Sequence, residues 1–202
     1  MLEEKLYRSV SLRQIQSLPE RLIISLNKEK KMEWKELLLD GYERIPQELE
    51  KILAGLKPLD LDWRPNPECN SIGWTIWHLA RVQDVQIANM MGEEQVYLKE
   101  KWFAKFNRPS DPRDSGFGAT VQDVAGFKSP DRQVLLEYVK VTTDQSKRYI
   151  KSIPAGELDR VLDEPRFNPL PTVGVRLVSI LADGHQHTGE ASYICGLWKT
   201  SF

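Results

Sequence analysis

The chain has 202 residues, of which 41% are hydrophobic and 28% are charged, a composition typical of one soluble globular domain with a sizeable core. With 28 basic and 29 acidic residues the formal net charge is −1, so the sequence predicts no dedicated nucleic-acid surface, which would need a basic excess. No apolar run reaches the roughly 18 residues that cross a bilayer, and the first residues lack the apolar stretch of a signal peptide. We therefore expect a cytoplasmic protein without a membrane or nucleic-acid partner.

Residues 1–31 are predicted to be an N-terminal extension of a domain that spans residues 32–202. A short charged run ends this stretch and Met32 follows at once, so an extra helix, a loose arm and sequence upstream of a second start all remain open. From Trp34 onward, apolar residues recur at the spacings of one helix face. This pattern predicts a first long helix that ends ahead of Pro58.

The proline-rich residues 58–69 are predicted to be a loop. Asn70 is a candidate N-cap for a second long helix, and Gly92 is its expected stop. Residues 93–130 have no single helical or strand period, and residues 108–118 among them are expected to be irregular. The Gly-Phe-Gly run in that loop predicts no phosphate cradle, because no strand precedes it and no Gly-Lys-Ser/Thr follows it.

Ser129 followed by Pro130 is a strong start signal for a third long helix, which is expected to reach about residue 153. A second long connection follows, and Thr172 is placed to cap a fourth long helix that extends to about Leu197. Four long helices without clear strands indicate an all-α protein. The expected fold is a four-helix bundle with long connections.

The three histidines of the chain lie on two of these helices. His78 belongs to the second predicted helix, whereas His185 and His187 belong to the fourth. Because an α-helix turns by about 100° per residue, Asp183, His187 and Glu190 share one stripe of the fourth helix. His185 falls on the opposite face, so the neighbouring pair of histidines is a poor chelate.

We expect His78, Asp183 and His187 to converge on one divalent metal ion, because two imidazoles and a carboxylate are a ligand set of zinc hydrolases and non-haem iron enzymes. Three protein ligands leave a coordination position for water or substrate, as a catalytic site requires. Glu190 is a candidate general base or a hydrogen-bond partner of a ligand. Three alternatives stay open: a hydrogen-bonded core histidine at position 78, a solvated pair of Asp183 and His187, and an unusual helix register in which His185 is the ligand in place of Asp183.

Arg81 is the second residue that we assign to the catalytic site, as an anchor for a substrate carboxylate. It lies on the same inward stripe of the second helix as Trp74 and His78. The alternative for this arginine is a salt bridge to Asp84 on the same helix, or to an acidic residue of another helix.

Two segments make the chain resemble the DinB-like superfamily of four-helix-bundle metal enzymes. Trp74, His78 and Leu79 form a segment similar to that family's Trp-x-x-x-His-Leu motif, and His187 and Glu190 match its His-x-Gly-Gln/Glu motif. Members typically use three histidines, one on the second helix and two at i and i+4 on the last. This chain departs from the pattern, because Asp183 stands where the third histidine is expected.

The resemblance implies a metal-dependent transferase or hydrolase that activates a thiol or a water for attack on a small molecule. Zinc and nickel are the metals it implies first, while the carboxylate of Asp183 also suits manganese or iron. A low-molecular-weight thiol as co-substrate and a homodimeric assembly are further implications. The competing hypothesis is a non-catalytic dimeric bundle that acts as a binding or scaffold protein and has lost its metal site.

Overall fold

The computed structural model describes residues 32–201, so the expected N-terminal extension, residues 1–31, lies outside the described residues. The chain divides into two units between Glu36 and Leu37, and the bundle belongs to the second unit. The described helices are α3 Trp34–Leu53, α4 Pro58–Leu61, α5 Ile72–Met91, α6 Val96–Lys99, α7 Trp102–Lys105, α8 Val121–Gly126, α9 Arg132–Ser152, the 3-10 helix η1 Ala155–Asp159 and α10 Val173–Ser201. The predicted all-α class is confirmed. No helix within residues 32–201 is both long and apolar enough to cross a membrane.

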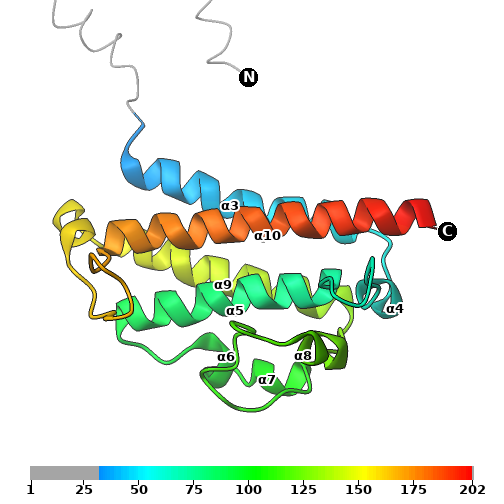
Figure 1. The fold of residues 1–202 in the computed structure, drawn as a ribbon. Helices are drawn as coiled ribbons and strands as arrows, with labels where there is room; N and C mark the ends of the chain where they lie inside the picture. The colour runs from blue at the N-terminus through cyan, green and yellow to red at the C-terminus, as the bar shows by residue number, and fades with distance from the viewer. Residues whose placement is uncertain (1–31, 202) are drawn as a thin grey trace, which may run out of the picture. The chain divides into compact units, whose positions relative to one another are not determined.

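The long helices pack side by side, and α5 packs against both α9 and α10 (Figure 1). Of its 20 residues 15 are buried, which explains why apolar residues occur on all its sides. Large fully buried side chains include Tyr42, Leu49, Trp77, Leu79 and Tyr138. Burying each such apolar side chain stabilises the fold by about 1.5–3 kcal/mol.

Helices α5 and α9 run in the same direction, whereas α10 runs antiparallel to α5 (Figure 1). The start of α5 at Gly73 lies against Ser129, just before α9, and further along Gln83 Nε2 donates to Ser146 Oγ at 2.8 Å. Two parallel helices need a connection that returns along the bundle. The segment 93–131, which carries α6, α7 and α8, makes this return, and we call it the crossover.

The start of α5 differs by one residue from the predicted cap, because Ser71, not Asn70, accepts the Trp74 N–H through its Oγ at 3.3 Å. Gly92 ends the helix with a φ of 66°, as expected. The predicted loop over residues 58–69 contains one helical turn, α4, with Pro58 in its first turn.

The predicted start of the third long helix, with Ser129 as its cap, is wrong by two residues. The Ser129 N–H donates to Asp62 Oδ1 at 2.8 Å, a bond between segments that a local cap signal does not reveal. Asp131 is the residue that caps α9, since its Oδ1 accepts the Gln133 N–H at 2.9 Å.

We expect Gly73→Ala to lower the free energy of unfolding by about 1–3 kcal/mol, the usual cost of overpacking a close contact. A Cβ at this position would lie 1.8 Å from Ser129 Oγ and 2.8 Å from Ser129 Cβ. Urea denaturation measures the effect. Gly189→Ala is the matched control, because this helical glycine has open space around it and an alanine there should not destabilise. Equal stability of the two variants would show that α5 and α9 do not meet closely at Gly73.

Candidate metal centre

One ring nitrogen of His78, on α5, forms a hydrogen bond within the protein, and the other is available to a ligand. Its side chain is almost buried and stacks on Trp74, with ring centroids 4.9 Å apart and planes 12° apart. Nδ1 lies 2.5 Å from the carbonyl oxygen of Ser115 in the crossover. Since a carbonyl only accepts, Nδ1 carries the proton and Nε2 keeps its lone pair. Burial lowers the pKa of His78, which favours this neutral form.

His187 on α10 is held by two carboxylates of its own helix. Its Nδ1 lies 2.7 Å from Glu190 Oε2, and its Nε2 lies 3.5 Å from Asp183 Oδ1. The spacings of three and four residues put all three side chains on one face of the helix. Burial acts to lower the pKa of His187, but hydrogen bonds to Asp183 and Glu190 outweigh it and raise that pKa.

The two imidazoles meet between α5 and α10. The ring centroids of His78 and His187 are 5.0 Å apart and the rings are nearly perpendicular, at 80°. His78 and Asp183 also line a cleft of about 580 Å³. The structure thus brings His78, Asp183, His187 and Glu190 to one location that opens to solvent.

Within residues 32–201, no group of three His, Cys, Asp or Glu side chains has the geometry to hold a metal ion as it stands. The chemistry of the donors nevertheless fits a divalent cation. In metal sites a histidine usually binds through one nitrogen and donates the other N–H to a carbonyl or carboxylate. His78 makes that bond to Ser115 and His187 makes it to Glu190. Asp183 adds an anionic oxygen beside His187 Nε2.

His185 lies apart from this cluster, as the helix geometry predicts. Its side chain is exposed and its Nε2 is 3.1 Å from the carbonyl oxygen of Gly41 on α3. His185 and His187, which are two positions apart on α10, thus face different surroundings. This difference provides a control for every experiment on His187.

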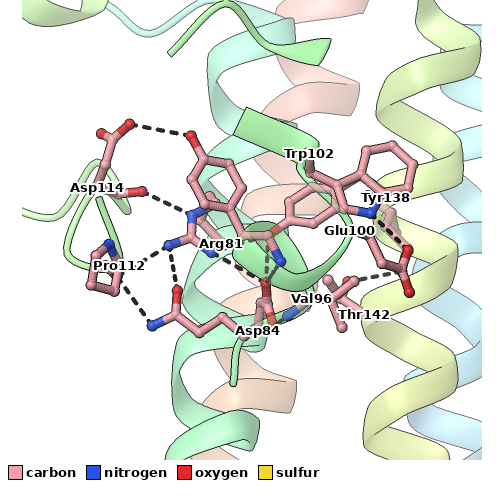
Figure 2. Close-up of polar contacts among 12 residues, drawn as sticks. Arg81, Asp84, Val96, Glu100, Trp102, Pro112, Asp114, Tyr138 and Thr142 are labelled. Carbon is pink, nitrogen blue, oxygen red and sulfur yellow. Dashed lines mark hydrogen bonds and ion pairs between the residues drawn. The ribbon is translucent and has the colours of Figure 1, made fainter. Parts of the chain in front are cut away.

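Arg81 lies in the interior among hydrogen-bonding partners (Figure 2), and it does not line the cleft. Its side chain and that of Asp84 are both 0% exposed and form an ion pair at 3.2 Å. Every N–H of the guanidinium has an acceptor: Asp84 Oδ2, Tyr138 Oη, Gln95 Oε1 and the carbonyl oxygens of Pro112 and Asp114. No donor remains for a substrate carboxylate, so the alternative interpretation, a salt bridge to Asp84, describes this residue.

Asp84 completes the buried network. Besides Arg81 and the Tyr138 hydroxyl at 2.8 Å, its carboxylate accepts the backbone N–H groups of Val96 at 2.9 Å and Tyr97 at 2.8 Å. These bonds tie α5 to the first turn of the crossover and to α9. A buried carboxylate with this many donors is paired on every side, as stable buried ions must be.

The position of the crossover over His78 was not predicted from the sequence. Gly116 has a φ of 79°, and a Cβ there would lie 2.9 Å from His78 Nδ1 and 3.0 Å from atoms of Trp74 and Trp77. Only glycine fits such a position without strain. The available signal was the Gly-Phe-Gly run, whose first glycine allows Ser115 to reach His78.

The bundle and its histidine–carboxylate cluster define a helical protein with a candidate metal centre between two helices. Residues 42–191 match the family model of the DinB superfamily. This match covers most of the chain, so the chain belongs to the DinB superfamily, and the resemblance inferred from its motifs is confirmed.

One similar solved structure is the crystal structure of a conserved protein from Enterococcus faecalis. It has a TM-score of 0.77 and 27% sequence identity, and the alignment covers 84% of this chain and 99% of that chain. No curated protein matches this chain. The similarity supports the fold and leaves the reaction to be argued from the site.

Proposed function

We propose that this protein is a metal-dependent enzyme that activates a thiol or a water for transfer to, or hydrolysis of, a small molecule. The observation that carries the proposal is the arrangement of the two imidazoles. Each has its Nδ1 occupied by a protein acceptor, and the rings meet at 5.0 Å beside the carboxylate of Asp183. Histidines that bind a metal through one ring nitrogen usually hydrogen-bond through the other in this way.

The residues take distinct parts in this proposal. His78 and His187 would bind the cation through Nε2, and Asp183 would bind it through a carboxylate oxygen. Such a cation supplies Lewis acidity, which lowers the pKa of a bound thiol or water so that it ionises near neutral pH. Glu190 is a positioning residue, because its hydrogen bond fixes the ring and the tautomer of His187.

A carboxylate in place of a third imidazole changes which metals suit the site. Oxygen ligands favour harder ions, so manganese and iron compete with zinc and nickel here more than they would at three histidines. The family resemblance further suggests a low-molecular-weight thiol as co-substrate and a homodimer as the working assembly. Light scattering on the full chain measures the assembly.

The test is elemental analysis of the untagged full chain after loading with zinc, nickel or manganese and removal of excess metal. We expect about one metal per chain in the wild type, and loss of most of that metal in His78→Ala and His187→Ala, because each variant removes one of the three ligands. His185→Ala is the matched control, since it removes an exposed imidazole of the same helix that faces Gly41. It should retain the metal.

Two results would contradict the proposal. Wild-type protein that takes up none of the three metals would mean that the cluster is a hydrogen-bond network, and a binding or scaffold role would then be the better hypothesis. Equal loss of metal in His185→Ala and His187→Ala would mean that the metal is bound elsewhere or not specifically.

A further inference from the structure

The cleft that His78 and Asp183 line has a second wall that the metal hypothesis does not use. Three segments far apart in the sequence form this wall: the crossover, the connection before α10, and the first turns of α10. Its charged and aromatic side chains are Arg113, Phe117, Arg166, Phe167 and Arg176. Three arginines face one acidic residue, Asp183, among the residues that line the cleft.

The three arginines differ in how much of their charge is already paired. Arg176 is nearly buried and forms a double hydrogen bond with Glu164, so its charge is neutralised within the protein. Arg113 is exposed and pairs with Asp111 at 3.1 Å. Arg166 is exposed and makes no ion pair with any residue that the structure describes. Arg166 is therefore the cation at the cleft that is available to a ligand.

Two phenylalanines hold Arg166 in place and offer apolar surface beside it. Its guanidinium carbon lies 4.8 Å from the ring centre of Phe167 and 5.8 Å from that of Phe117. These distances are typical of cation–π contacts, which orient a guanidinium over a ring. Phe117 is 81% exposed and Phe167 is 40% exposed, so neither ring is used to fill the core.

We infer that this cleft binds a small molecule that joins an oxyanion, a carboxylate or a phosphate, to a flat apolar or aromatic body. Arg166 would bind the oxyanion, because a guanidinium presents parallel N–H donors that match its oxygens. The exposed rings of Phe117 and Phe167 would contact the body. That this molecule is a substrate rests on the proposed function. Its binding to the cleft requires no metal.

The experiment is a calorimetric titration of the metal-free full chain with phenyl phosphate at low ionic strength. Benzyl alcohol serves as the neutral probe and inorganic phosphate as the anion without a ring. We expect phenyl phosphate to bind more tightly than either, and Arg166→Gln to weaken its binding about tenfold, which is the effect of losing one charge-assisted hydrogen bond of about 1.4 kcal/mol. Phe117→Ala should weaken the binding of phenyl phosphate more than that of inorganic phosphate, because only the former contacts the ring.

Arg44→Gln is the matched control, because it removes an exposed arginine of α3 that pairs with Asp40 and does not line the cleft. Equal weakening by Arg44→Gln and Arg166→Gln, or unchanged binding in Arg166→Gln, would overturn the inference. So would inorganic phosphate that binds as tightly as phenyl phosphate.

The same titration on His187→Ala separates this inference from the proposed function. Anion binding that persists in that variant would support the cleft as an anion site that does not depend on the metal ligands. It would accompany rejection of the metal enzyme only where the wild type also takes up no metal. The opposite outcome has two parts: the wild type binds metal, and Arg166→Gln binds phenyl phosphate as tightly as the wild type. This outcome would support the metal enzyme and reject the anion site.

Discussion

Arg81→Ala is expected to lower the free energy of unfolding by about 3–5 kcal/mol, the cost of leaving one partner of a buried ion pair without its counter-charge. The substitution removes the cation from the carboxylate of Asp84, which is 0% exposed. It also leaves Gln95 Oε1 and the Asp114 carbonyl oxygen without their donors, whereas the Pro112 carbonyl oxygen keeps the Gln95 Nε2–H at 3.1 Å. Urea denaturation followed by tryptophan fluorescence and by circular dichroism measures the change.

Two companion variants make the result specific. Arg44→Ala removes an exposed arginine and should leave the free energy of unfolding nearly unchanged. Arg81→Lys keeps the positive charge but offers three donors in place of five, so its stability should lie between those of the wild type and Arg81→Ala. A loss in Arg81→Ala no larger than in Arg44→Ala would contradict the buried network of Figure 2.

Gly116→Ala is expected to weaken metal binding about 10- to 100-fold, the range seen when the outer hydrogen bond of a ligand is lost. The added Cβ would lie 2.9 Å from His78 Nδ1, between buried rings of Trp74 and Trp77 that have no room to retreat. The crossover must then lift, and the Ser115 carbonyl leaves the imidazole. Competition with a chromophoric chelator measures the affinity.

Gly118→Ala separates this contact from simple backbone strain. Gly118 also has a positive φ, 72°, but a Cβ there would meet nothing within 4 Å. It should cost some stability and leave the affinity for metal unchanged. Nitrogen NMR of the histidine rings adds a readout that needs no metal: His78 should carry its proton on Nδ1 in the wild type and in Gly118→Ala, and lose this preference in Gly116→Ala. Identical behaviour of both alanine variants would contradict the proposed contact.

The long helices were predictable because their signals are local. The spacing of apolar residues after Trp34 and the glycine at position 92 act within one helix, so sequence alone places α3 and α5 to within a few residues. The shared face of Asp183, His187 and Glu190 follows equally from the pitch of one helix. At Ser129 a distant segment takes part, because the Ser129 N–H donates to Asp62, and α9 begins later than its local cap signal predicts.

Arg81 shows what sequence reasoning could not reach. Helix periodicity places this arginine on an inward stripe with His78, and either a substrate or a buried acid could explain it there. The decision depends on where the crossover runs, because Pro112 and Asp114 supply two of its acceptors from more than 30 residues away. Nothing in the composition of residues 93–131 encodes that path. The arginines of the cleft were missed because Arg113, Arg166 and Arg176 meet there only through the paths of two long connections.

Two side chains of α5 hold the crossover through its main-chain carbonyl groups. His78 contacts the carbonyl oxygen of Ser115, and Arg81 binds those of Pro112 and Asp114, so none of these bonds depends on which side chain is present. Related chains can therefore diverge at positions 112 and 115 and still hold the histidine in the same tautomer. The positions where the side chain itself matters are instead Gly116, where a Cβ would lie 2.9 Å from His78 Nδ1, and Arg81, whose guanidinium donates to five acceptors. Alignments that weigh only side-chain identity near the proposed metal ligands would overlook the segment that orients His78.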